Sequence, residues 1–152
     1  MHATSMLTLG LAALAAAAPA SHKENKKSQN KFAVTNFVCG CTVGCYWNFD
    51  LAIKGSAPNH PAIDNPVHCS GGLDEDTDYV DCGEISATQS LKAYVVKETN
   101  ELKLQYVTMP YDQPDAVYRF YGNTTVYSAT GVDAEKQERN FNVKESYATA
   151  VA

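Results

Sequence analysis

The chain has 152 residues, with 12 Lys or Arg against 17 Asp or Glu, so its net charge is −5 at pH 7. This length suits one globular domain. The acidic balance disfavours nucleic acid and anionic membranes, which proteins bind mainly through clustered Lys and Arg, and we expect neither as a partner.

Residues 1–20 predict a secretory signal peptide, because an apolar run that ends in small residues precedes a polar segment. The run starts at Met6 and is about 13 residues long, shorter than the ~20 that a membrane helix needs. We expect cleavage after Ala20, with Ala18 as the alternative site. No later segment of the sequence is long and apolar enough for a span, so we expect no membrane insertion.

Residues 21–31 predict a flexible basic arm, since they hold four lysines and no apolar residue. The body that remains, residues 32–152, has eight basic and 16 acidic residues, a net charge of −8. We expect this body to be a single secreted domain.

The clearest strand signal runs from residue 46 to residue 54. Large apolar residues alternate with smaller or polar ones there, which is typical of a half-buried strand. The apolar face consists of Trp47, Phe49, Leu51 and Ile53. Residues 32–38 alternate more weakly and lead into a turn that holds three cysteines. Four large side chains on one face predict that this strand covers the core.

The rest of the body also predicts strands. Residues 55–66 form a proline-rich exposed loop, residues 66–70 a short strand and residues 71–81 an acidic connection. Hairpins are expected for residues 90–97 with 101–109, and for residues 117–121 with 124–130 around Gly122 and Asn123; a turn or helical turn at 133–139 precedes a last strand at 141–147. About seven short strands without a long amphipathic helix predict an all-β fold, a small antiparallel β-barrel or sandwich.

Five cysteines in a short exported chain indicate disulfides, with one cysteine left over. A bridge between Cys69 and Cys82 would contribute about 3 kcal/mol, and one between Cys39 and Cys45 about 2.4 kcal/mol. Cys41 is equally placed to replace Cys39, so the spacing leaves that choice open. A metal site at this cysteine cluster would need reduced thiols, which export disfavours, and we expect no metal.

The acidic connection has aspartates at alternate positions, like the first ligands of a calcium loop. Asp74, Asp76 and Asp78 would be those ligands. Such a loop needs Gly at its sixth place and Glu at its twelfth, where this chain has Tyr79 and Ile85. The pattern therefore predicts a solvated acidic loop.

Catalysis has little support in the sequence. A copper site would need His22 as the first residue of the mature chain, with His60 or His68, and that cut would place Pro19 at the disfavoured −3 position. No nucleophile elbow and no Cys/His pairing with a third member is visible. We expect no catalytic residue and no cofactor.

Asn123-Thr124-Thr125 is a glycosylation sequon in a predicted tight turn. Use as a glycan site and an unused turn sequence remain equal alternatives, because turn geometry alone favours Asn after Gly. We expect the strand tyrosines to pack in the core or in cross-strand pairs rather than to form a sugar platform. These are Tyr94, Tyr106, Tyr118, Tyr121 and Tyr127.

A series of short motifs over residues 32–147 carries a family resemblance. In order they are VTNF, the cysteine cluster, CYWNFDLAI, HCS, YVDCGE and DAEKQERNFNVKESY. This order resembles the Alternaria major-allergen family of fungal secreted proteins, and it is most similar to the branch of hypersensitive-response-inducing elicitors. Tyr79 followed by Cys82 and Gly83 is the most telling piece.

The resemblance implies a compact antiparallel β-barrel without known enzymatic activity, secreted by a fungus and recognised by a plant or animal host. It also implies that Cys69 pairs with Cys82, and that Cys45 pairs with a cysteine several residues upstream, which favours Cys39. Cys41 departs from the elicitor pattern. As the unpaired cysteine, it would allow the intermolecular homodimer that some family members form.

These features favour an effector or elicitor that acts in the host apoplast and binds a host defence protein or receptor without catalysis. Loops 55–66 and 71–81 are its expected contact surfaces, the second by negative charge. The expected partner-binding residues are Asp74, Glu75, Asp76 and Asp78. The alternatives are a carrier of a small apolar ligand, and a host-protein inhibitor or allergen-like binding module.

Overall fold

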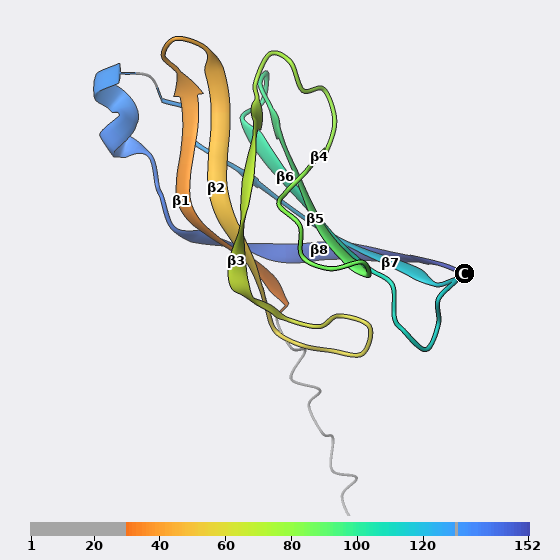
Figure 1. Ribbon diagram of the computed structural model, residues 1–152. Coiled ribbons are helices and arrows are strands. Elements are labelled where there is room, and N and C mark those ends of the chain that lie inside the picture. The colour runs from red at the N-terminus through yellow and green to blue at the C-terminus, as the bar shows by residue number, and fades with distance from the viewer. Residues whose placement is uncertain (1–29, 130) are drawn as a thin grey trace, which may run out of the picture.

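The computed structural model describes residues 30–129 and 131–152, which form eight strands and one short 3-10 helix (Figure 1). The strands are β1 (Lys31–Cys41), β2 (Cys45–Lys54), β3 (Ile63–Gly72), β4 (Val80–Asp81), β5 (Gln89–Val96), β6 (Glu101–Thr108), β7 (Val117–Thr125) and β8 (Phe141–Val151), and the helix is η1 (Gly131–Lys136). They make one antiparallel sheet in the order β3-β2-β1-β8-β7-β6-β5-β4. The predicted all-β fold is therefore confirmed.

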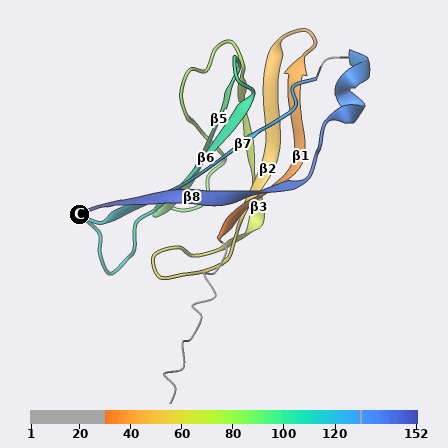
Figure 2. The same cartoon turned by 180° about the vertical axis from the view of Figure 1, so that it is seen from behind.

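The sheet curls until its two edge strands, β3 and β4, approach each other, which gives a nearly closed barrel (Figures 1 and 2). The Cys69–Cys82 disulfide, which the resemblance implied, joins β3 to the residue after β4. Beside it, Gly83 N donates a hydrogen bond to His68 O over 2.9 Å. Edge strands expose unpaired backbone groups, so this bridge joins the two edges of the sheet.

The predicted core face of β2 is confirmed, because its four apolar side chains are each at most 1% exposed. Trp47 stacks on Phe49 with ring centroids 5.6 Å apart, and Phe37 of β1 lies 5.8 Å from Phe49. The opposite wall contributes Leu91, Val95, Leu102, Leu104 and Tyr106, all equally buried. Each such side chain stabilises the fold by ~1.5–3 kcal/mol. The interior of the barrel is thus filled by side chains.

The predicted hairpin around Gly122 and Asn123 is wrong, because β7 runs unbroken through both residues. They pair with Leu104 and Lys103 of β6. Gly122 is required for a different reason: a Cβ atom there would lie 2.8 Å from the ring of Phe32. A glycine that predicts a turn in the sequence instead makes room for a core ring.

Other boundaries differ by a few residues. β1 begins at Lys31, which the sequence placed in the basic arm, and β3 begins at Ile63, so the loop before it spans residues 55–62. The predicted signal peptide and residues 21–29 of the arm lie outside the described residues. No helix in residues 30–129 or 131–152 is long and apolar enough to cross a membrane.

The outer edge of β1 changes partner halfway along. β8 pairs with β1 from Lys31 to Val34, and β1 then bulges, with Asn36 at a left-handed φ of +56° that Asn tolerates better than most residues. Beyond the bulge, the side-chain amide of Gln137 accepts from Cys39 N over 3.1 Å and donates to Cys39 O over 2.8 Å. The amide therefore satisfies edge groups that no strand covers.

Candidate functional site

Three segments lie together at one end of the barrel, and we call this the hairpin end: the β1–β2 turn at residues 42–44, the acidic connection at residues 73–79, and η1 (Figure 1). The first two are joined directly, since Leu73 N donates to Cys45 O over 2.9 Å. The opposite end is crossed by loop 55–62, and we call it the loop end.

The disulfide at the hairpin end joins Cys41 to Cys45, so the predicted Cys39–Cys45 bridge is wrong. Cys41 and Cys45 face each other where β1 and β2 meet, with Cα atoms 4.0 Å apart, whereas Cys39 lies opposite Trp47. Cys41 is therefore not the unpaired cysteine, and this bridge is incompatible with a homodimer through Cys41.

The unpaired cysteine is Cys39, which is 1% exposed. Burial raises the pKa of its thiol, against a smaller lowering by a hydrogen bond with Ser128. The thiolate is the reactive form of cysteine, so a buried thiol with a raised pKa is chemically inert. Cys39 thus belongs to the core.

The four predicted partner-binding carboxylates are of two kinds. Asp76 Oδ2 accepts a hydrogen bond from Gly72 N over 2.6 Å, and Asp74 forms an ion pair with Lys97 after β5. These two contacts fix the acidic connection to the sheet. Glu75 is exposed, and so is Asp78, which accepts from the N–H of the next residue. Asp74, Glu75 and Asp78 are therefore the exposed carboxylates, Asp74 within its ion pair, whereas Asp76 is half-buried.

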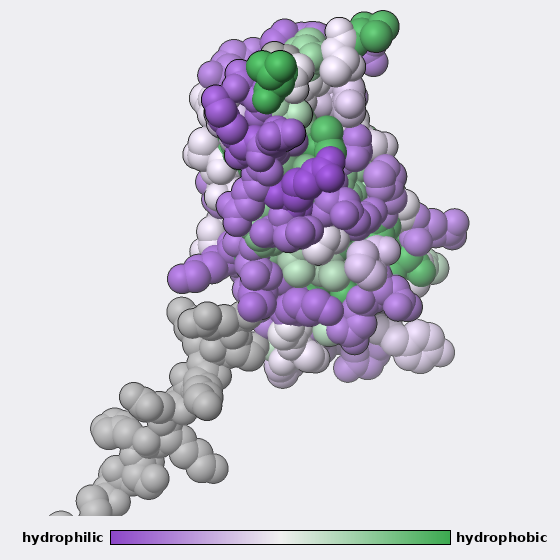
Figure 3. All heavy atoms as spheres, turned by 90° about the vertical axis from the view of Figure 1, so that its left-hand side faces the viewer, coloured by the Kyte–Doolittle hydropathy of each residue, from purple (hydrophilic) through white to green (hydrophobic). Residues whose placement is uncertain are grey.

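The hairpin end also presents isolated apolar side chains. Val43, in the turn closed by the Cys41–Cys45 bridge, is fully exposed, and Val132 of η1 is 94% exposed. The side of the molecule seen in Figure 3 is mostly hydrophilic, and the hydrophobic atoms at its upper end lie in small separate areas. This end therefore combines negative charge with apolar side chains on a cross-linked turn.

Within the described residues, no group of three or more His, Cys, Asp or Glu side chains is placed to hold a metal ion. The aspartates that resemble a calcium loop have separate partners, Lys97 for Asp74 and Gly72 N for Asp76. For the copper alternative, His22 lies outside the described residues and His60 is only 2% exposed. A site at the surface would thus have to do without His60.

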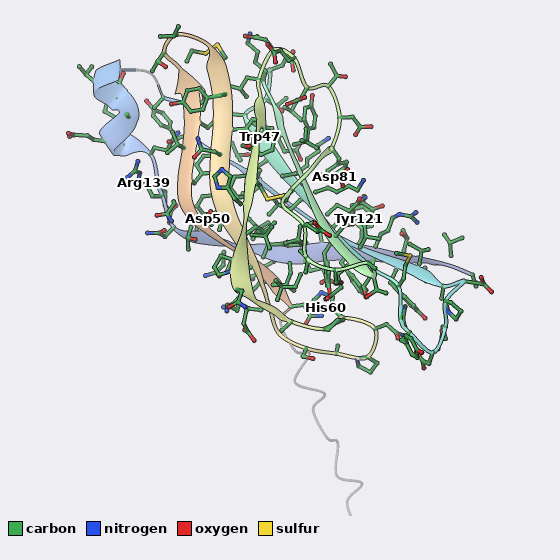
Figure 4. The ribbon with its side chains drawn as sticks, viewed as in Figure 1. Trp47, Asp50, His60, Asp81, Tyr121 and Arg139 are labelled. Carbon is green, nitrogen blue, oxygen red and sulfur yellow. A yellow bond between two sulfur atoms is a disulfide. The ribbon has the colours of Figure 1, made fainter. Side chains whose placement is uncertain are left out.

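A polar network on the outer wall was missed in the sequence. Asp50 of β2 accepts from Asn36 Nδ2 over 2.9 Å and lies 3.0 Å from His68 Nδ1 of β3 (Figure 4). The hydrogen bonds from Asn36 and then from His68 hold the pKa of Asp50 below its usual value. In the sequence, Asp50 and His68 each stand at an outward position of a predicted strand. That they face each other depends on the register between β2 and β3, which the sequence does not give.

An Asp–His pair of this kind orients an imidazole, as in hydrolases. A nucleophile would have to lie about 2.6–3.2 Å from the other ring nitrogen. Among the described residues, the one side-chain hydrogen bond of His68 is to Asp50. The pair therefore joins β2 to β3.

His60, at the loop end, is a second feature that the sequence did not reveal (Figure 4). Its ring lies edge-on to Phe120 and Tyr106, with centroids 4.3 and 5.2 Å away. His60 Nε2 lies 2.9 Å from Glu145 Oε2, close enough for an ion pair but not at the angle of a hydrogen bond. His60 Nδ1 is buried without a hydrogen-bond partner. Loop 55–62 is therefore anchored into the barrel through His60, and its use as a contact surface stays a prediction.

Asn123, the predicted glycosylation site, is exposed on the outer face of β7. Its Nδ2 donates a hydrogen bond to Glu101 Oε1 over 2.7 Å. The sequon thus lies on a strand and not in the tight turn that the sequence predicted.

A scan against protein-family models, a search of curated proteins and a search of solved structures gave no significant match to this chain. The resemblance to the Alternaria major-allergen family thus remains an expectation from short motifs, and the fold and the hairpin end stand on their own geometry.

Proposed function

We propose that the protein is a secreted, non-catalytic effector or elicitor whose hairpin end contacts a host defence protein or receptor. The observation that carries the proposal is the combination at this end of solvent-facing carboxylates and a fully exposed Val43 on a turn closed by a disulfide. A contact surface gains affinity when it is held in its bound shape beforehand, because less conformational entropy is lost on binding.

Charge gives the partner its expected chemistry. The body carries a net charge of −8 over residues 32–152, and Glu75 and Asp78 are exposed carboxylates of the acidic connection. A negative surface steers a basic partner and speeds its association, with an effect that falls as salt rises. We therefore expect a host protein with a basic patch around an apolar pocket that receives Val43.

The test is infiltration of purified protein into leaf tissue, with cell death as the readout. The contact variant is Glu75→Gln with Asp78→Asn and Val43→Ser, three exposed positions. The amide oxygen introduced by Asp78→Asn can still accept the hydrogen bond from Tyr79 N. A matched control changes the same kinds of residue elsewhere, Asp112→Asn with Asp115→Asn and Val151→Ser, all exposed. We expect the control to act like wild type and the contact variant to lose at least tenfold in activity. Equal activity of the two variants would remove the hairpin end from the site.

The filled core weighs against the carrier alternative. A carrier needs an apolar cavity, whereas the interior described above is occupied by aromatic and aliphatic side chains. A surface hollow of about 820 Å³ beside η1 is lined mostly by polar residues such as Thr124, Asn140 and Asn142. Displacement of a hydrophobic dye by an apolar plant metabolite would revive the carrier. An inhibitor or allergen-like module would use the same contact surface and is separated from an elicitor by the leaf response.

A further inference from the structure

Three tyrosines from distant parts of the chain line one hollow of about 350 Å³ on the outside of the barrel. They are Tyr79 before β4, Tyr121 in β7 and Tyr147 in β8, and we call the hollow the three-tyrosine pocket. The rest of its wall is formed by Glu101, Lys103, Gly122, Asn123 and Ser146. Figure 4 labels Tyr121 on this part of the sheet.

Two of these rings form a flat aromatic surface. Tyr121 and Tyr147 are cross-strand partners whose rings stack with centroids 4.4 Å apart and planes 12° apart. Tyr147 is 58% exposed, so one ring face is open to solvent. The two rings point outward and do not pack in the core. Exposed aromatic rings with polar neighbours are typical of binding sites.

The polar groups of the pocket are already held in place. Asn123 Nδ2 donates to Glu101 Oε1 over 2.7 Å, and Ser146 Oγ donates to Tyr121 O over 3.0 Å. Burial, followed by the nearby Tyr147, Tyr121, Asp78 and Glu101, raises the pKa of Tyr79 to about 12. The Tyr79 hydroxyl therefore remains a hydrogen-bond donor at any physiological pH. An apolar ring face beside fixed donors and acceptors suits a pyranose, which has an apolar face and a hydroxyl edge.

The pocket wall contains a glycosylation sequon. Asn123 begins the sequon Asn123-Thr124-Thr125, its side chain is exposed, and Tyr121 precedes it by two residues. Side chains two residues apart in a strand point to the same face. A sugar attached to Asn123 Nδ2 would thus start beside the Tyr121 ring.

We propose that Asn123 carries an N-linked glycan and that its first N-acetylglucosamine packs into the three-tyrosine pocket. In the transfer, Asn123 Nδ2 attacks C1 of the sugar of a lipid pyrophosphate-linked oligosaccharide. The N–C1 bond forms, the bond from C1 to the phosphate oxygen breaks, the lipid pyrophosphate leaves, and Nδ2 loses one proton to the transferase. The modified amide keeps one N–H, enough to preserve the hydrogen bond to Glu101. The inference rests on export, which is part of the proposed function.

Glycan occupancy of Asn123 is tested with residues 21–152 secreted from yeast behind a yeast signal. The result then depends neither on the predicted leader nor on elicitor activity. Thr125→Ala destroys the sequon, and Thr125→Ser is the matched control that keeps it. We expect an intact mass that falls on treatment with peptide N-glycosidase in wild type and Thr125→Ser but not in Thr125→Ala. An unmodified wild-type chain would overturn the proposal and leave the leaf experiment unaffected.

Packing is tested on protein trimmed by an endoglycosidase to a single N-acetylglucosamine. We expect this sugar to raise Tm by about 3 °C relative to the Thr125→Ala protein. The same comparison in a Tyr147→Ala background should lose most of this gain, whereas a Tyr111→Ala background, which alters a 96% exposed ring elsewhere, should keep it. An equal gain in all three backgrounds would show that the sugar does not use the pocket.

Discussion

The two ends of the barrel close in opposite ways. At the hairpin end, a disulfide and the contacts of Asp74 and Asp76 fix the backbone while Val43, Glu75 and Asp78 point outward. At the loop end, the backbone is fixed by a side chain that points inward, His60, which is buried between aromatic rings. The comparison teaches that one buried side chain can anchor a polar, proline-rich loop whose other residues face solvent.

The largest expected effect comes from breaking the loop end. We expect His60→Ala to lower the free energy of unfolding by about 3–4 kcal/mol, because it leaves a cavity against Phe120 and removes the polar neighbour of Glu145 Oε2. Urea unfolding at pH 7 measures the loss.

The matched control is His68→Ala, since His68 faces solvent and its side chain is 62% exposed. We expect its loss to stay below about 1 kcal/mol. Similar losses in the two variants would mean that His60 does not anchor loop 55–62 to the barrel.

The two disulfides sharpen the comparison next. Removing the bridge between the sheet edges with Cys69→Ala and Cys82→Ala should cost about 3 kcal/mol, and removing the hairpin bridge with Cys41→Ala and Cys45→Ala about 2 kcal/mol, because the second closes a shorter loop. Thermal unfolding of both double variants beside wild type gives the order. A larger loss at the hairpin bridge would contradict this order and assign that bridge a role in the core.

Much of the fold was predictable because period-2 alternation does not depend on distant partners. The alternation of apolar residues in β2 predicts four core side chains, and all four are buried: Trp47, Phe49, Leu51 and Ile53. The hairpin of β5 and β6 followed from two alternating runs around a short turn. In both cases the signal lies within a dozen residues.

The site was less predictable because it depends on register between strands. Whether Cys39 or Cys41 faces Cys45 is decided by a register shift of two residues between β1 and β2, which spacing alone leaves open. His60 reaches Glu145, and Tyr79 reaches Tyr147, only after the sheet has closed. No local pattern encodes these contacts.

The smallest expected effect concerns the wall between the two ends, where Asp50 and His68 form an acid–histidine pair that is more exposed than the pair of Glu145 and His60. The pKa of Asp50 is lowered on folding, so its contribution to stability is present above its unfolded pKa of about 3.9 and is lost as pH falls through the folded value. The side chain is 30% exposed, so we expect less than about 1 kcal/mol.

Asp50→Asn should therefore unfold at lower urea than wild type at pH 6, and the two midpoints should converge as the pH falls below about 3. Asp64→Asn, at an 82% exposed ion pair with Lys54, is the control and should show almost no difference at either pH. A gap for Asp50→Asn that persists at low pH would mean that the aspartate acts through shape and not through charge. In that case the pair of Asp50 and His68 would not act through charge. Burial alone would then no longer explain why His60 contributes more to stability than His68.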